Sequence, residues 1–160
     1  MSFARPAAAA ILGVAAALLV SCGGGDESSE PSLPAGHEGL MVIEGWVETL
    51  ANGDVEGAAG YFALPSVVEN GTAPLTLRSR ADAIAFNDSL PCGAKLLRAR
   101  PVDRFIAATF RLTERPGGDC GSGVGELART AFVVRDGKIV QWRRLPNPPS
   151  NQGGGGGPIV

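Results

Sequence analysis

The sequence predicts one α+β domain with about three helices first and a curved antiparallel sheet after them. Apolar residues recur at helical spacing in residues 38–51, and strand-like alternation begins only after Cys92. Asp136-Gly137 then joins the last two strand-like segments, as in a two-residue hairpin. Because the helices precede the strands instead of alternating with them, we expect the helices to pack on one face of the sheet.

The helices are predicted from one apolar stripe and two capping signals. The stripe in residues 38–51 consists of Leu40, Ile43, Val47 and Leu50. Asp54 can cap a second helix over residues 55–62 by accepting hydrogen bonds from its unpaired N–H groups. Ser79 and Asp82 stand at the spacing of a capping box, which predicts that a third helix starts at Ser79.

Four strands are predicted in the second half of the chain, over residues 95–100, 105–114, 127–135 and 138–144. Alternation along the second strand places Phe110 on the core side and Arg111 on the outer side. The turn at Asp136-Gly137 needs positive φ at both residues, which this dipeptide tolerates. The glycine-rich residues 116–125 lack the lysine of a phosphate-binding loop and are expected to form a plain connection.

Residues 1–21 are predicted to be a lipoprotein signal peptide. Arg5 precedes an apolar run over residues 7–20, which is the charged-then-apolar plan of a secretory signal. The run is shorter than the roughly 20 residues that a transmembrane helix needs. It ends in Leu19-Val20-Ser21-Cys22, which resembles the bacterial lipobox. The resemblance implies cleavage before Cys22, lipid on that cysteine, and a location at the extracytoplasmic side of the cell membrane.

Two segments of low complexity are expected to flank the domain. Residues 22–37 are rich in Gly, Ser, Glu and Pro and are predicted to form a flexible tether. Residues 147–160 contain a run of glycines and are predicted to be a disordered tail. The folded domain is therefore expected over residues 38–146.

The cysteine count predicts a disulfide. With Cys22 assigned to lipid, the three cysteines of the chain leave Cys92 and Cys120 to pair in an oxidising envelope. A metal site is the alternative for these two thiols. It lacks ligands, because the single histidine, His37, lies in the tether and the sequence holds no Cys-x-x-Cys pair. No metal and no cofactor are expected.

Two stretches carry a family resemblance. Residues 46–57 run from Trp46 through Asn52-Gly53-Asp54 and lead into Tyr61-Phe62-Ala63, and residues 132–140 form the closing hairpin. Together they resemble the nuclear transport factor 2-like superfamily, which includes ketosteroid isomerases and SnoaL-like polyketide cyclases. The resemblance implies a cone-shaped fold that encloses an apolar pocket.

The same resemblance argues against isomerase chemistry. In ketosteroid isomerases an aspartate moves a proton, while a tyrosine and a protonated acid hold the oxyanion. Matching the motifs places Trp46 at the tyrosine, Asn70 at the aspartate and Thr130 at the second acid. An asparagine amide cannot accept a proton near neutral pH, and neither of the other two side chains replaces its counterpart.

The predicted pocket lining combines aromatic residues with polar residues on predicted strands and at the matched positions. These residues are Trp46, Tyr61, Asn70, Phe86, Arg129, Thr130 and Trp142. Arg129 is included because alternation places it on the same face as Leu127 and Ala131, where it would be a charged group inside the pocket.

The leading hypothesis is a non-catalytic, lipid-anchored pocket domain that binds a small apolar or amphiphilic molecule or a protein partner. With 14 Lys and Arg against 16 Asp and Glu, the chain lacks the basic excess of a nucleic-acid binder. One alternative is a SnoaL-like enzyme of isomerase, cyclase or hydrolase type with relocated residues, such as Arg129 with Asp103 or Glu114. The other is a structural module that forms a homodimer through its sheet face.

Replacing Cys22 by Ala is expected to release the protein from membranes, because the acyl chains on that cysteine supply the membrane affinity. Membrane fractionation and incorporation of labelled fatty acid measure this effect. Ser21→Ala keeps a small residue before the cut and should leave both readouts unchanged. Full membrane retention of the Cys22→Ala protein would contradict the predicted anchor.

Overall fold

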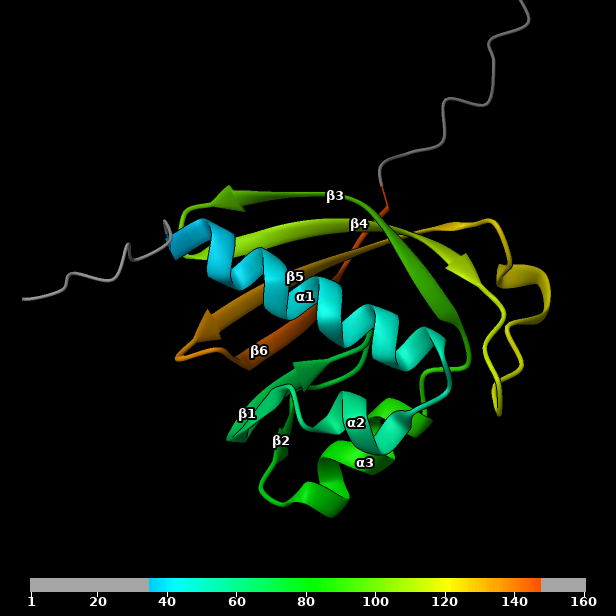
Figure 1. The fold of residues 1–160 in the computed structure, drawn as a ribbon, viewed down its shortest axis with the longest axis horizontal. Coiled ribbons are helices and arrows are strands. Elements are labelled where there is room, and N and C mark those ends of the chain that lie inside the picture. The colour runs from blue at the N-terminus through cyan, green and yellow to red at the C-terminus, as the bar shows by residue number, and fades with distance from the viewer. Residues whose placement is uncertain (1–34, 148–160) are drawn as a thin grey trace, which may run out of the picture. The chain divides into compact units, whose positions relative to one another are not determined.

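The computed structural model describes residues 35–147. The predicted signal peptide, Cys22, most of the predicted tether and nearly all of the predicted tail lie outside these residues. In the described part, three α-helices pack on one six-stranded sheet that curves around the first helix (Figure 1). No helix among these residues is both long and apolar enough to cross a membrane.

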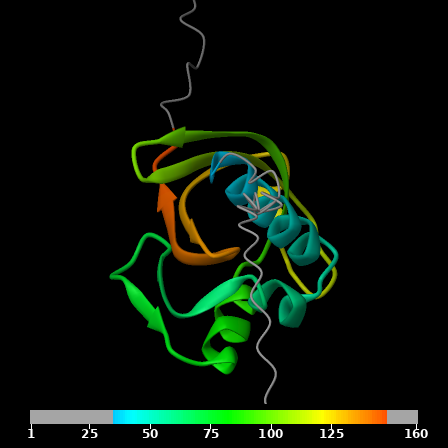
Figure 2. The same ribbon diagram turned by 60° about the vertical axis from the view of Figure 1, so that its left-hand side comes forward.

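The first helix, α1, spans Ala35–Ala51 and lies in the concave side of the sheet (Figures 1 and 2). It begins three residues before the predicted start at residue 38 and thus includes the end of the predicted tether. The predicted stripe faces the core, since Ile43 and Leu50 are buried. Trp46 on this helix is also buried, against the aromatic rings of the sheet.

The second helix, α2, spans Val55–Ala59 and is shorter than the predicted 55–62. Asp54 caps it as expected, with its Oδ1 accepting from the Gly57 N–H at 2.7 Å. The helix ends early because the next residues pair with the sheet. The Tyr61 carbonyl accepts from the Ile139 N–H at 2.8 Å, and Phe62 begins a strand.

The third helix, α3, spans Arg80–Asp88, and its predicted capping box is confirmed. The Ser79 hydroxyl accepts from the Asp82 N–H at 3.1 Å, and the Asp82 carboxylate accepts from the Ser79 N–H at 3.0 Å. The same carboxylate oxygen accepts from the Arg78 N–H at 2.9 Å. These bonds, with that from the Arg78 N–H contributing most, hold the pKa of Asp82 below its ordinary value of 3.8.

The four predicted strands are present with extended ends: β3 at Gly93–Val102, β4 at Phe105–Thr113, β5 at Leu127–Arg135 and β6 at Lys138–Leu145. Neighbouring strands in this group pair antiparallel. The turn between β5 and β6 has φ of 51° at Asp136 and 68° at Gly137, as the predicted hairpin requires.

Two further strands were not predicted: β1 at Phe62–Glu69 and β2 at Leu75–Leu77. They complete the strand order β2-β1-β6-β5-β4-β3. The prediction of a purely antiparallel sheet is wrong, because β1 pairs parallel to β6. Pro65 and a register shift between Phe62 and Val67 obscure the alternation of β1 in the sequence.

The cysteines pair as predicted. Cys92 lies just before β3, and Cys120 lies just before a short 3₁₀ turn, η1, at Gly121–Gly123. Their disulfide joins segments 28 residues apart in the sequence. It ties the loop that follows β4 to the start of β3, at the same end of the sheet.

Replacing both Cys92 and Cys120 by Ser is expected to lower the free energy of unfolding by roughly 3.5 kcal/mol, because the crosslink restricts the unfolded chain. Urea unfolding with and without reductant measures the loss. Reductant should destabilise the parent protein and leave the double variant unchanged. Two reactive thiols from these cysteines in native, oxidised protein would contradict the pairing.

Asp82→Ala is expected to lower the melting temperature at neutral pH. A carboxylate whose folded pKa is depressed contributes stability above its unfolded pKa and loses it as pH falls through the folded pKa. The difference between parent and variant should therefore vanish as pH falls below the ordinary value of 3.8. Circular dichroism melts across this range test it. Asp88→Ala removes the same charge at the other end of α3 and should cause no comparable loss.

Candidate functional site: a pocket with one apolar and one polar wall

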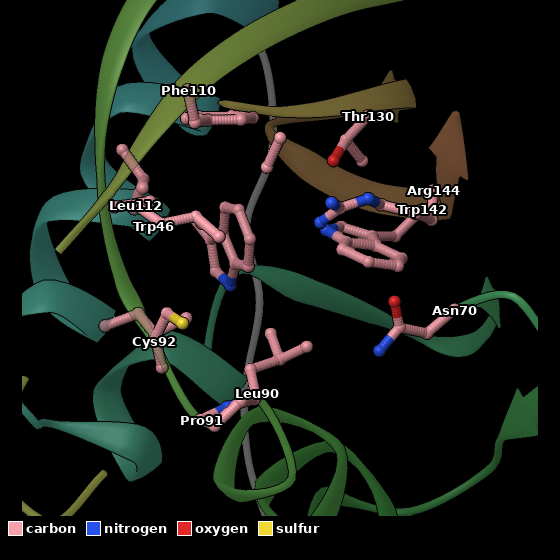
Figure 3. Close-up of a pocket in the computed structure, with 14 residues that line it drawn as sticks. Trp46, Asn70, Leu90, Pro91, Cys92, Phe110, Leu112, Thr130, Trp142 and Arg144 are labelled. Atoms are coloured by element: carbon pink, nitrogen blue, oxygen red, sulfur yellow. The ribbon is translucent and has the colours of Figure 1, made fainter. Parts of the chain in front are cut away.

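A pocket of about 330 Å³ lies between α1, the inner faces of β3 to β6 and the segment that leads into β3 (Figure 3). Its wall is formed mainly by apolar side chains, with a few polar groups among them. The lining residues are Trp46, Val47, Leu50, Asn70, Leu90, Pro91, Cys92, Ala94, Phe110, Leu112, Ala128, Thr130, Trp142 and Arg144.

One wall of the pocket is apolar. Strand β4 contributes Phe110 and Leu112, which alternate onto its inner face as the sequence predicts. The segment between α3 and β3 contributes Leu90 and Pro91, which approach from below in Figure 3. The disulfide at Cys92 holds the start of β3 in place beside them.

Trp46 forms the floor of the pocket, and a hydrogen bond to the protein interior fixes its indole ring. Its Nε1–H donates to Asn87 Oδ1 at 2.9 Å, and Asn87 Nδ2–H donates to the Ala83 carbonyl at 2.8 Å. Asn87 is fully buried. Since the indole N–H is already bonded to the protein, Trp46 offers a ligand only its ring.

Four aromatic rings surround the Trp46 indole in edge-on contacts, with ring centroids 5.6 to 6.5 Å apart. These rings belong to Phe62, Phe110, Phe132 and Trp142. Such contacts favour well-defined ring orientations. The floor of the pocket is therefore a continuation of the hydrophobic core.

The opposite wall is polar and comes from adjacent strands. Thr130 on β5 lies directly across from Arg144 on β6 in the antiparallel register. Trp142 precedes Arg144 by two residues and therefore shares its face of β6. Asn70 directly follows β1, where Glu69 pairs with Arg143 in parallel register. Figure 3 shows Arg144 and Trp142 on the same side of the pocket as the Thr130 hydroxyl, across from Trp46.

Two donors on this wall lack partners in the described part of the chain. Burial lowers the pKa of the half-buried Arg144 guanidinium. No described carboxylate stands among the residues that line the pocket around it. The group nevertheless stays cationic, as arginine does in proteins. Trp142 is 3% exposed, and its Nε1–H has no hydrogen-bond partner among the described residues.

Four of the seven predicted pocket residues line the pocket: Trp46, Asn70, Thr130 and Trp142. They include all three positions that the resemblance matched to isomerase catalytic residues. The other three, Tyr61, Phe86 and Arg129, do not line this pocket.

The misplaced aromatic residues pack elsewhere. Tyr61 places its hydroxyl against Gly45 of α1, where a side chain would collide with it. Phe86 lies behind the pocket wall, with its ring centroid 5.7 Å from Phe62 and 5.2 Å from Trp142. Phe86 therefore packs against the lining residue Trp142 without lining the pocket itself.

Arg129 lies on the outer face of β5, where its Nη1–H donates to the Pro146 carbonyl at 3.1 Å. The inner face instead carries Ala128, Thr130 and Phe132. The sequence misled because Ala131 and Val133 are buried on the outer face as well. Long side chains of neighbouring strands, including Arg143 opposite Ala131, can cover such small apolar residues.

Arg144 is a charged lining residue that the sequence analysis did not single out. It is one of several arginines on the predicted strands, and charge alone does not distinguish it from the others. Its position two residues after Trp142 was the available signal, because alternation puts both side chains on one face.

Among the described residues, the pocket lining holds no Asp, Glu, His, Lys or Tyr, and its cysteine is in a disulfide. The relocated catalytic set of the enzyme alternative is not assembled there. Asp103 is exposed in the turn between β3 and β4, and the Glu114 carboxylate accepts from the Cys120 N–H at 3.3 Å. Within residues 35–147, no three His, Cys, Asp or Glu side chains gather as a metal site would require.

No protein-family model and no curated protein matches this sequence, but solved structures match its fold. A candidate ketosteroid isomerase from Kribbella flavida is 18% identical with a TM-score of 0.52, over 72% of this chain and 86% of its own. A candidate polyketide cyclase from Sinorhizobium meliloti is 15% identical with a TM-score of 0.51, over 71% of this chain and 95% of its own.

A nuclear transport factor 2-like protein of unknown function from Burkholderia xenovorans is 12% identical with a TM-score of 0.50, over 71% of this chain and 90% of its own. At such low identity these similarities concern the fold and not the activity. The described domain has the nuclear transport factor 2-like fold, with three helices packed on a curved, mixed sheet of six strands.

Proposed function

We propose that this domain is a non-catalytic binding module that takes one small amphiphilic molecule into its pocket. The observation that best supports this function is a pocket of about 330 Å³ with an apolar wall facing a polar one. This volume falls at the small end of the range in which proteins bind small molecules, about 300 to 1,000 Å³. The proposal includes attachment to the outer side of the cell membrane through lipid on Cys22.

The composition of the lining supports binding over catalysis. Proton transfer near neutral pH needs a group that can accept or release a proton at that pH, such as a carboxylate or an imidazole. The positions matched to the isomerase residues hold Trp46, Asn70 and Thr130. Within residues 35–147, Arg144 is the only ionisable group that lines the pocket. The candidate ketosteroid isomerase and the candidate polyketide cyclase among the structural neighbours share the fold of this domain. The described lining residues of this pocket do not supply acid–base chemistry.

The positive charge of the outer sheet face argues against the alternative of a dimerisation module. The guanidinium carbons of Arg104 and Arg143 lie 5.0 and 5.1 Å from the centre of the Phe105 ring. Arg129 lies on this face as well. Apposing two copies through this face would bring like charges together, which opposes self-association.

The chain carries a built-in reporter for the proposed ligand. Its two tryptophans, Trp46 and Trp142, both line the pocket. A ligand that enters should change the intrinsic tryptophan fluorescence of the full chain carrying Cys22→Ala. The probe 1-octanol has one polar head and one apolar tail, so it tests for amphiphile binding without assuming a charge.

Ala128→Leu is expected to weaken 1-octanol binding by about tenfold, because the added carbons displace about two methylene groups of ligand at ~0.8 kcal/mol each. The melting temperature should hold or rise, since the new side chain fills existing space. Ala107→Leu adds the same volume on the outer face of β4 and should leave binding unchanged. Absence of 1-octanol binding to the parent protein, with Ala128→Leu stabilising, would contradict the proposal and favour a structural module.

A further inference from the structure

We infer that the ligand of this pocket carries a carboxylate, held by Arg144, Trp142 and Thr130, with its apolar tail against Phe110 and Leu112. This inference rests on the proposed binding function and specifies its ligand class. It follows from the charge of the polar wall, from its excess of donors and from its position relative to the apolar wall.

The positive charge of the polar wall favours an anionic ligand. Arg144 is half-buried among apolar lining residues, and no described carboxylate compensates it. A ligand that fills the pocket displaces water from this guanidinium, and a buried charge without a partner is costly. A neutral or cationic ligand would leave that cost uncompensated, whereas an anionic head group would remove it.

The polar wall offers mainly hydrogen-bond donors, which favours a ligand that accepts hydrogen bonds. The Trp142 Nε1–H is buried and can only donate, and the guanidinium of Arg144 likewise offers donors alone. The Thr130 hydroxyl can add a third donor. A carboxylate provides two oxygens with about four acceptor positions and matches the planar fork of arginine.

The geometry places the three donors together. Thr130 and Arg144 are cross-strand partners, Phe132 pairs with Trp142 in the same ladder, and alternation sends Trp142 and Arg144 to one face. Figure 3 shows this group facing Phe110 and Leu112 across the pocket. One guanidinium with an apolar wall opposite it fits an amphiphilic monocarboxylate better than a molecule charged at both ends.

The test is isothermal titration calorimetry on the full chain carrying Cys22→Ala, with three probes that share one alkyl chain: octanoate, 1-octanol and octyltrimethylammonium. Octanoate is expected to bind at least about tenfold more tightly than 1-octanol, because charge-assisted hydrogen bonds form only with the carboxylate. Octyltrimethylammonium should bind most weakly, since its head group repels Arg144 and accepts no hydrogen bond.

Variants of the polar wall test whether its residues cause the preference for octanoate over 1-octanol. Arg144→Met should abolish the preference for octanoate while leaving 1-octanol binding in place. Arg144→Lys keeps the charge without the fork and should retain part of the preference, which also tests the idea if the Met variant fails to fold. Trp142→Phe should weaken octanoate more than 1-octanol. Arg129→Met removes the same charge from the outer face and should keep the full preference.

Equal binding of octanoate and 1-octanol by the parent protein would overturn the carboxylate assignment and leave the proposed binding function standing. Equal loss of preference in Arg144→Met and Arg129→Met would also overturn it, because the effect would then come from net charge. If none of the three probes binds the parent protein, the proposed function fails together with the assignment.

Discussion

The hydrogen bond from the Trp46 indole to Asn87 is the interaction on which the domain and its pocket depend. It joins α1 to α3 in the interior, where leaving either polar group unpaired would cost about 1–3 kcal/mol. The bond sets the orientation of the indole, and four aromatic rings pack against it edge-on. Because the same ring forms the floor of the pocket, the core and the site are one continuous structure.

Strand alternation divides the pocket into two walls. Successive residues on β4 that face inward are apolar, while the facing pair Thr130 and Arg144 on β5 and β6 is polar. The Arg144 guanidinium and the Trp142 N–H have no partner in the described part of the chain, which is unfavourable for folding alone. Unsatisfied groups that converge on one cavity are a feature of binding sites, where a ligand supplies the missing partners.

The described domain shares its fold with the structural neighbours, while the residues that line its pocket differ from the catalytic set that the family resemblance implied. The structural neighbours establish how the chain folds, and fold alone leaves activity open. The positions that the resemblance assigned to acid–base catalysis all face the pocket, yet they hold Trp46, Asn70 and Thr130. Trp46 cannot even offer its N–H to a ligand, because Asn87 already accepts from it. Among the described lining residues, none is a carboxylate or an imidazole, the groups that usually transfer protons near neutral pH.

The sequence by itself determined the features that depend on nearby residues or on composition alone. The capping box of Ser79 and Asp82, the turn at Asp136-Gly137, the apolar stripe of α1 and the pairing of the two remaining cysteines all depend on local hydrogen bonds, local dihedral angles or composition. Tertiary structure decided the parallel pairing of β1 with β6, the outward direction of Arg129 and the place of Arg144 in the pocket. These features depend on partners from distant parts of the chain. A strand also reveals its inner face only when its neighbours are known, since long arginine side chains can bury apolar residues on the outer face too.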